Sequence, residues 1–494
     1  MFYYLGRIAT RFRWFIVGVW LVGILIALPF APQAPSVLHP GGFSSPDAQS
    51  QQAIDLLVQK LHLDQTLVQV IFTSSRYSTD SPEFIQESQQ ALTNIRSWSE
   101  VSGIVSFTDN PRQISIDRHA AYVNVLLKPD PDSAPKLLPE LEHRLLPAPD
   151  LKTSIGGGPV FYEDIQAVSE RDLRRAETLA VPFAIIALLL VFRSVIAAIL
   201  PALVGGGAVI VSLALIFGLG QISDLSIFVL NITTLFGLGL GVDYSLFMVS
   251  RFREELAHGK SVEEAVPITV ATAGRAVTFS GFTVSIGLVG LIFFRINMLH
   301  SVGIGGILVV MMAVFAAITL LPAVLAILGT RVNAFPVRLP KFWHNRQPAF
   351  ITLVAASKTS SALQQDIHTG FWYRLSHIVM RYPVQIFIPV LLFLVALGTP
   401  FLQGVRFSAP DASILPPDVP SRAAFDLLTK RFNVRETSPI LLAVQTQGNV
   451  LTPDNIRKLY WYVQRIEADP RVARVDSIVS ADPRFTLAQY ELLY

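Results

Sequence analysis

One acidic side chain stands in the middle of a long apolar run of this sequence. Asp243 is the single charged residue of the segment 225–250, which is long enough to cross a bilayer. A charged group in hydrocarbon is costly, so an acid inside a membrane helix is a candidate functional residue. Loss of water favours the neutral form of a carboxylic acid, and such a group can bind and release protons. The pattern predicts a proton carrier; the alternative is a structural polar group that its neighbours satisfy.

A tyrosine and three glycines accompany this acid. Tyr244 follows Asp243, and Gly237, Gly239 and Gly241 precede the pair. Consecutive residues of a helix do not face each other, so the pair is expected to reach across to another helix and not to bond to itself. Gly239 shares the face of Asp243, whereas the other two glycines share the face of Tyr244. Small residues at such spacings let membrane helices approach closely, so we expect all three to pack helices at the relay.

Two serines of the next apolar segment are candidates for the same site. Ser280 and Ser285 lie in the predicted span 277–294. Their hydroxyls could join a polar network near Asp243, but bonding back to carbonyls of their own helix is an equal alternative. The sequence leaves both possibilities open.

Several other chemistries are excluded or disfavoured. The chain has no cysteine, which excludes disulfides and thiolate metal sites, and its net charge of +3 is too small to indicate nucleic acid binding. Gly259-Lys260-Ser261 is similar to the end of a nucleotide-binding P-loop, but Glu254 stands where that motif needs glycine. We therefore expect no enzyme activity, no metal site and no bound cofactor.

Composition and apolar runs predict a multi-pass α-helical membrane protein. Charged residues make up only 15% of the chain, against about 25% in soluble domains. The expected spans are residues 14–30, 176–192, 195–219, 225–250, 277–294, 302–328 and 384–402. The segments on the side of the N-terminus hold fifteen lysines and arginines, whereas the two short loops opposite hold only Arg295. By the positive-inside rule the N-terminus is cytoplasmic, and the protein lies in the cell membrane.

The spans divide the chain into six expected parts. These are a first transmembrane helix (1–30), a domain outside the membrane (31–175), a five-helix transmembrane bundle (176–328), a cytoplasmic linker (329–383), a seventh transmembrane helix (384–402) and an incomplete second outer domain (403–494). The first outer domain alternates helix-like and strand-like segments, with Val68, Val70 and Phe72 on one strand face. The expected class is α/β, with short helices on a small sheet in a ferredoxin-like arrangement.

The chain begins a second copy of its own plan. Four residues near the N-terminus recur 370 positions later, where Leu5, Ile8, Arg11 and Phe12 correspond to Leu375, Ile378, Arg381 and Tyr382. Residues 53–57 match residues 424–428 at an offset of 371. A register held over so long a stretch indicates duplication. We expect residues 44–107 and 415–478 to form the same helix–strand–helix–strand unit, and we expect this internal repeat to be truncated, with halves of about 370 residues.

Three motifs resemble one known family. The first is the glycine-rich run that ends in Asp243-Tyr244, followed by Arg251-Phe252-Arg253-Glu254-Glu255. The second is the stretch 272–285, and the third is Gly41-Gly42-Phe43 with Pro46-Asp47. Together they are similar to the large mycobacterial-type membrane proteins (MMPL) of the resistance–nodulation–division superfamily, and the resemblance covers the whole chain.

The resemblance implies an exporter of lipids or other amphiphilic molecules that proton influx drives. Asp243 and Tyr244 would relay protons, and the outer domains would be porter domains for the substrate. The implied partners are membrane lipids, a lipid-like or hydrophobic substrate, and a second transmembrane bundle from the same chain or a separately encoded half. Two alternatives stay open: a non-transport factor of the same superfamily, either sterol-sensing-like or accessory to protein translocation, and an inactive gene fragment.

Overall fold

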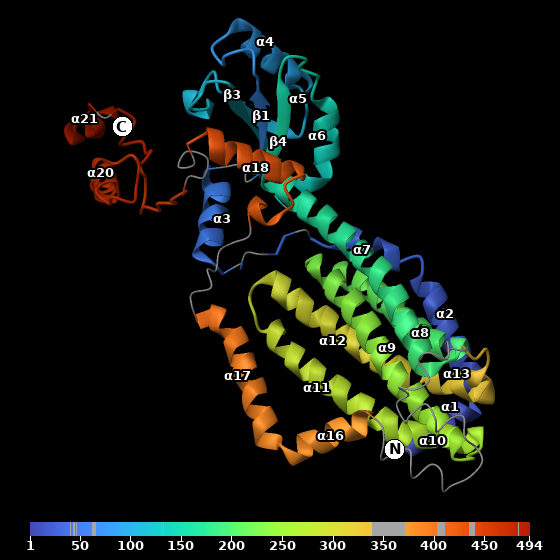
Figure 1. Ribbon diagram of the computed structural model, residues 1–494. Coiled ribbons are helices and arrows are strands. Elements are labelled where there is room, and N and C mark those ends of the chain that lie inside the picture. Colours follow the sequence, from blue (N-terminus) through green and yellow to red (C-terminus); the bar gives the residue numbers. More distant parts are fainter. Residues whose placement is uncertain are drawn as a thin grey trace. The chain divides into compact units, whose positions relative to one another are not determined.

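The chain forms two compact units, each assembled from two separate stretches of sequence (Figure 1). The computed structural model describes residues 1–494 except 40, 43–44, 46, 62–65, 130, 132, 338–370, 403–410, 434–439 and 483. The membrane unit contains Met1–Pro46 and Ile165–Asp411, and the sheet unit contains Asp47–Asp164 and Ala412–Tyr494. Most of the expected linker 329–383 lies outside the described residues.

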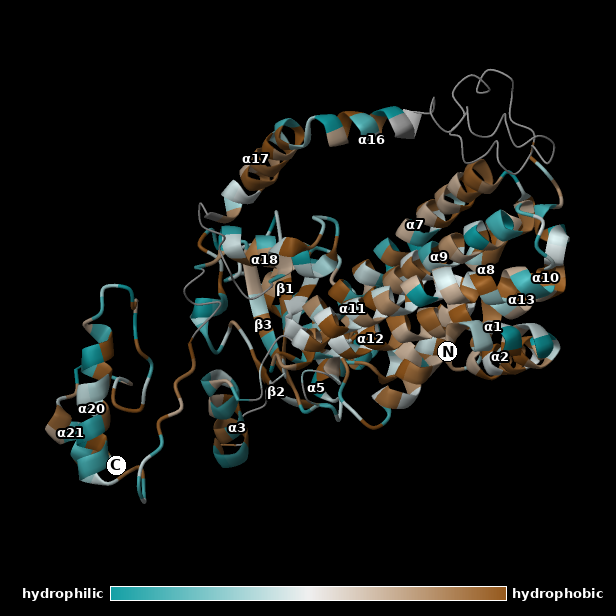
Figure 2. Cartoon of the chain, turned by 90° about the horizontal axis from the view of Figure 1, so that it is seen from below, coloured by the Kyte–Doolittle hydropathy of each residue, from teal (hydrophilic) through white to brown (hydrophobic). Residues whose placement is uncertain are grey.

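Long apolar helices build the membrane unit, and Figure 2 colours their residues by hydropathy. Among the described residues six helical segments are long and apolar enough to cross a bilayer. They are α7 (Gly158–Phe192), α8 (Val195–Gly220), α9 (Phe228–Ala257), α10 to α11 (Val262–Ile292), α12 to η5 (Asn297–Asn333) and α17 (Pro383–Leu402). A seventh span results if α1 (Phe2–Arg11) and α2 (Arg13–Ala27), which meet at 86°, count as one. The chain is therefore a multi-pass helical membrane protein.

Helices α8, α9 and α12 (Asn297–Ile318) form the centre of the membrane unit. About half of the apolar window of each is buried, whereas α7 and α11 (Arg275–Ile292) keep most of theirs exposed. Met248 and Phe252 of α9 are fully buried in the shared core. The exposed apolar faces of the peripheral helices are of the kind that lipid covers.

A four-stranded antiparallel sheet forms the first part of the sheet unit. Its order is β2 (Val101–Val105), β3 (Ala120–Leu127), β1 (Thr66–Thr73), β4 (Lys152–Gly157). Helices α4 (Pro82–Ala91) and α5 (Thr93–Arg96) connect β1 to β2, and α6 (Leu138–Arg144) connects β3 to β4. Val68, Val70 and Phe72 of β1 point into one core with these helices, as their alternation predicts.

Helix α18 (Pro420–Arg431), from the second copy of the repeat, covers the other face of this sheet. Its Ala424 and Leu428 share a buried cluster with Ile71 and Tyr122 of the strands. The approach is close, because a Cβ on Gly156 of β4 would lie 2.9 Å from the Cβ of Ala424. One apolar face of the sheet is therefore covered by α18, which begins at Pro420, far beyond the end of the last strand at Gly157.

Polar contacts reinforce this long-range docking. The backbone N–H of Ser421, in the first turn of α18, donates to Asp164 Oδ2 at 2.8 Å. At the other end of the helix Arg431 donates twice to Asp117 Oδ2, at 2.6 and 2.9 Å.

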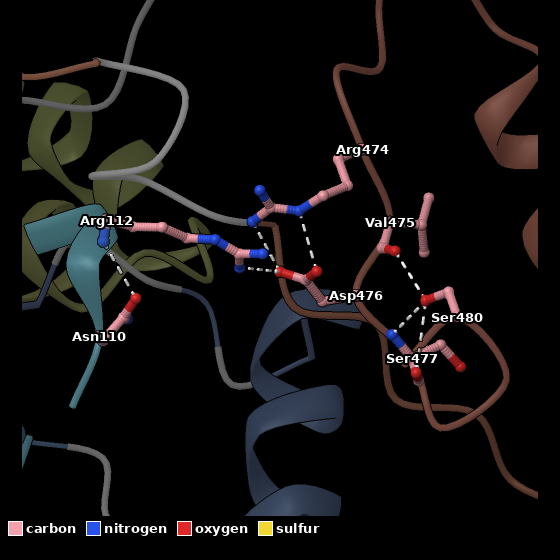
Figure 3. Close-up of polar contacts among 7 residues, drawn as sticks. All are labelled: Asn110, Arg112, Arg474, Val475, Asp476, Ser477 and Ser480. Atoms are coloured by element: carbon pink, nitrogen blue, oxygen red, sulfur yellow. Dashed lines mark hydrogen bonds and ion pairs between the residues drawn. The ribbon is translucent and has the colours of Figure 1, made fainter. Parts of the chain in front are cut away.

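A further cross-contact lies outside α18. Arg112 Nη1 donates to Asp476 Oδ2 at 3.0 Å, and Figure 3 shows Arg474 donating to the same carboxylate. The two stretches of the sheet unit are thus joined by ion pairs as well as by apolar contact.

The helices of the second copy lie at the positions that the repeat predicts, but the expected strands do not form there. Helix α3 (Gln49–Leu61) corresponds to α18 at the offset of 371, and α4 with α5 corresponds to α20 (Pro453–Glu467). The prediction of a second helix–strand–helix–strand unit is wrong for its strands, because residues 440–446 and 472–477 form no strand. A strand needs a neighbour for its backbone hydrogen bonds, and no second sheet is present among the described residues.

Removal of the Asp117 carboxylate should weaken the docking of α18 on the sheet. Burial acts to raise the pKa of Asp117, but hydrogen bonds from Ser115, Arg431 and the His119 amide outweigh it and lower the pKa from 3.8 to about 2. For Asp117→Asn we expect hydrogen exchange of α18 amides to be roughly two- to fivefold faster at neutral pH, the scale of an exposed ion pair. Asp469→Asn, which breaks only a contact with nearby Arg471, is the control and should leave α18 unchanged.

The pH dependence of this contact follows from the lowered pKa. The stabilisation by Asp117 is complete above its ordinary pKa and is lost as pH falls through about 2. Wild type and Asp117→Asn should therefore differ in stability near neutral pH and converge at the acid end of a denaturant series. A stability difference that persists undiminished below that range would contradict the assignment.

Candidate functional site

Helix α9 carries both residues of the expected relay and directs them to different sides. The Asp243 side chain is exposed at the surface of the described chain, whereas Tyr244 is only 6% exposed and belongs to the core of the membrane unit. This divergence follows from helix geometry, because neighbouring residues point about 100° apart. The structure therefore does not bring the carboxyl and the phenol of this pair together.

Asp243 opens onto an apolar cavity of about 420 Å³ between α7, α8 and α9. Ala180 and Leu188 of α7 and Ala202 of α8 line it, together with Gly239 and Val242 of α9. Among the lining residues only Asp243 and Glu177 are ionisable. Asp243 has no hydrogen bond or ion pair with any residue that the structure describes. The site thus presents an unpaired acid to an apolar space.

On another side of α9, Tyr244 faces α11. Its hydroxyl lies 3.7 Å from the position that a Cβ would take on Gly281. The hydroxyls of Tyr244, Ser245 and Ser285 are all buried, and none has a hydrogen-bond partner among the described residues. Thr233 of α9 has a fourth buried hydroxyl without such a partner. Buried polar groups are normally paired, so these unpaired hydroxyls in one apolar bundle require an explanation.

The two candidate serines of α11 separate in the structure. Ser285 is buried on the α11 face that carries Gly281, one helical turn away, so it belongs on the side of Tyr244. Ser280 is exposed and lies on another face. Ser285 does not bond back to its own helix, unlike Ser212 of α8, whose hydroxyl donates to Ala208 O at 2.8 Å.

The glycines set the distance between α8 and α9. A Cβ on Gly241 would lie 2.5 Å from the Cα of Gly205, and a Cβ on Gly237 would lie 2.3 Å from Cγ2 of Val209. Both positions therefore exclude a side chain. Gly239, on the face of Asp243, has nothing within 4 Å in the described chain. It packs against no helix here, and it widens the opening beside the acid.

The charged motif after the relay anchors the end of α9. Arg251 pairs with Glu254 at 2.8 Å and also with Glu255. Arg253 donates to Asn333 Oδ1 at 2.7 Å and to the carbonyl of Phe192 at 2.9 Å. Arg253 thus ties α9 to the last residue of α7 and to η5 (Gly329–Asn333). These residues position α9, and none of them lines the cavity at Asp243.

The Gly41-Gly42 motif after the first span bonds to the chain just before α9 and to the start of α12. Ser226 donates its hydroxyl to Gly41 O, and the N–H of Met298 donates to Gly42 O, both at 2.9 Å. Gly42 has φ +98°, a conformation that side chains disfavour, and a Cβ there would lie 3.2 Å from Met298 N. Phe43 and Pro46 of the same motif lie outside the described residues.

Two residues of the site were not anticipated from the sequence. Glu177 lines the cavity of Asp243, although it is 66 positions away in the chain and belongs to the edge of another span. Ser245 adds a third unpaired hydroxyl, and its position directly after Tyr244 was the only available signal. No group of three His, Asp or Glu side chains among the described residues could hold a metal ion.

The matched glycines allow a direct test of the helix contact. Gly241→Ala places a methyl group against the backbone of α8, so we expect a loss of about 1–3 kcal/mol in stability. Gly239→Ala meets open space and gains helix propensity, so it should be neutral or slightly stabilising. The measurement is the thermal unfolding midpoint of the purified chain. Equal effects, or a larger loss for Gly239→Ala, would show that α8 and α9 do not cross at Gly205 and Gly241.

Curated relatives of this chain are membrane exporters or putative membrane proteins. The chain is 30% identical over 471 residues to the trehalose monomycolate exporter MmpL3 of Mycobacterium tuberculosis, with 91% of this chain and 49% of the relative covered. It is 28% identical over 411 residues to the mycolic acid-containing lipids exporter MmpL11 of Mycolicibacterium smegmatis, with coverage of 80% and 40%. A putative membrane protein of Streptomyces coelicolor is 28% identical over 461 residues, with coverage of 92% and 61%.

The chain spans about half the length of the MmpL3 relatives that it matches. The profile of the MMPL family matches residues 37–386, which include the Gly41-Gly42 motif, the sheet, helix α9 and the stretch 272–285. This match extends over well more than half of the sequence. The chain therefore belongs to the MMPL family.

Proposed function

We propose that the chain is part of an exporter that uses proton influx to move lipids or other amphiphilic molecules across the cell membrane, with Asp243 as the proton carrier. The observation that carries the proposal is the unpaired Asp243 carboxyl at an apolar cavity of the relay helix. An unpaired carboxyl group in an apolar membrane helix is a candidate proton carrier. The export of lipids by MmpL3 and MmpL11, as their names state, supports the substrate class.

The unpaired hydroxyls support a second part of the relay. The buried hydroxyls of Tyr244, Ser245 and Ser285 lack partners among the described residues, so a proton carrier such as water could bond to them, and they lie away from the cavity of the acid. A rotation of α9 or the arrival of another helix would be required to connect the two sides. Ser280, which is exposed, is not part of this proposed route.

The sheet unit is proposed to be the porter domain, outside the cytoplasm. The strand order β2-β3-β1-β4, with helices between β1 and β2 and between β3 and β4, supports a ferredoxin-like class. The excess of lysine and arginine on the side of the N-terminus supports a cytoplasmic N-terminus and hence an outer position for this unit.

A second transmembrane bundle is proposed to complete the site. The open space at Gly239 and the exposed Asp243 suit the docking of another helix on this face. Repeats in transporters commonly meet at the coupling site near the midplane of the bilayer. The repeat offset places the counterpart of Asp243 near position 614, in the remaining half that the longer relatives contain or in a separate chain. The counterpart is expected to be another acid–aromatic pair.

The amide variant tests the proton carrier. In vesicles that contain the complete transporter with this chain, Asp243→Asn should reduce pH-gradient-driven lipid export to the rate of protein-free vesicles, because asparagine keeps the shape but cannot titrate. Asp243→Glu should retain part of the activity. Asp454→Asn, at an exposed acid of the sheet unit that pairs with Lys458, is the control and should export like wild type. Full export by a correctly folded Asp243→Asn protein would refute the relay.

A further inference from the structure

The first helix of the chain presents three different faces. Gly6 and Ala9 of α1 are buried, and a Cβ on Gly6 would lie 2.5 Å from the Cα of Pro267 in α10 (Val262–Thr269). On a second face the large apolar side chains of Tyr4, Ile8 and Phe12 are 68%, 52% and 50% exposed. One face therefore belongs to the protein, and an apolar stripe with a four-residue spacing points away from it.

The third face of α1 is basic. Arg7 and Arg11, one helical turn apart, are exposed beside the apolar stripe. Their guanidinium groups stack on aromatic rings, with Arg7 5.3 Å from the ring centre of Tyr3 and Arg11 5.6 Å from that of Phe12. Neither arginine forms an ion pair with an acidic side chain among the described residues. Two cations held at a fixed spacing are thus available for an anion.

The direction of α1 relative to the first span suits a helix at the membrane surface. Helix α2 is almost wholly apolar, and α1 meets it at 86°. If α2 crosses the bilayer, α1 lies along the surface with the apolar stripe toward the acyl chains. A short amphipathic helix with arginines beside aromatic and aliphatic residues is typical of this location.

The repeat contains part of this arrangement a second time, since Ile8, Arg11 and Phe12 recur, whereas Arg374 stands at the position of Tyr4 and His377 at that of Arg7. Helix α16 (Phe371–Arg381) precedes the apolar helix α17, and Figure 1 shows a sharp turn between the two. Its Ile378 and the following Tyr382 are exposed at positions that correspond to Ile8 and Phe12. Arg381 lies 5.5 Å from the ring centre of Tyr382, which reproduces the contact of Arg11 with Phe12. Two separate segments thus combine an exposed apolar stripe with a stacked arginine.

We propose that α1, and α16 as its second copy, bind anionic phospholipids at the cytoplasmic surface of the membrane. Tyr4, Ile8 and Phe12 insert at the boundary of the acyl chains, and Arg7 and Arg11 bind the phosphates. A planar guanidinium suits phosphate because it donates two parallel hydrogen bonds, and the cytoplasmic leaflet attracts basic segments. The inference rests on the cytoplasmic N-terminus of the proposed function, but it does not require proton transport.

Lipid retention by the purified full chain tests the basic face. The chain is equilibrated in micelles with equal amounts of dioleoyl-phosphatidylglycerol and dioleoyl-phosphatidylcholine, and native mass spectrometry counts the lipids that stay bound. Wild type should retain more phosphatidylglycerol. Each arginine contributes roughly a fivefold preference, so Arg7→Gln with Arg11→Gln should lower phosphatidylglycerol retention on the order of tenfold or more at this site. Phosphatidylcholine retention should not change.

Matched variants distinguish lipid binding at this site from a general effect of positive charge on the protein. Arg471→Gln with Arg484→Gln removes the same charge from exposed loops of the sheet unit and should leave lipid retention unchanged. Arg374→Gln with Arg381→Gln should reproduce the loss at α16. An unchanged ratio of the two lipids in the Arg7 and Arg11 double variant would overturn the proposal, whatever that variant does to export.

A probe on the apolar stripe tests the location of α1 independently. Since the chain has no cysteine, Ile8→Cys carries a single nitroxide or fluorescent label. In phosphatidylglycerol vesicles the label should be quenched by lipid-borne quenchers and shielded from water-soluble ones. A label on Ile116→Cys, an exposed residue of the sheet unit, should show the opposite behaviour. A label at position 8 that water-soluble quenchers reach freely would overturn the proposal and favour a protein partner for this face.

Discussion

The cost of placing a carboxyl group in an apolar helix bundle is the constraint on which the rest of the membrane unit depends. Asp243 avoids a fully enclosed position because α9 turns it toward a cavity of α7 and α8. That placement is possible because Gly241 and Gly205 let the backbones of α9 and α8 touch, which fixes the rotation of α9. The same rotation directs Tyr244 into the core beside Gly281. One helix contact therefore determines where both relay candidates lie.

Contacts near the two ends of α9 join the helix to its neighbours. Arg253 joins one end to α7 and η5, and the Gly41-Gly42 segment joins the chain before α9 to the start of α12. The sheet unit also depends on contacts between distant segments, since α18 of the second repeat covers the sheet of the first. A duplicated chain can build one domain from both of its copies, because equivalent helices present equivalent apolar faces.

Features that depend on local sequence could be predicted. Apolar length identified the spans, and alternation identified the buried face of β1, whereas the functional role of Asp243 stays a prediction. Features that depend on contacts between distant segments could not. The repeat assigned α18 to a second domain, since periodicity shows which face of a helix is apolar but not which surface it covers. For the same reason the sequence did not connect Glu177 with Asp243, and it did not separate buried Ser285 from exposed Ser280.

The central claim is that Asp243 takes up and releases a proton within the membrane. Its most direct test is the reaction of the vesicle-embedded chain with dicyclohexylcarbodiimide, a hydrophobic reagent that modifies protonated carboxyl groups, followed by peptide mass spectrometry over a series of pH values. The account predicts modification of Asp243 that declines as pH rises, with no modification of exposed Asp454. Absence of modification at every pH, with the reagent shown to enter the membrane, would contradict the account.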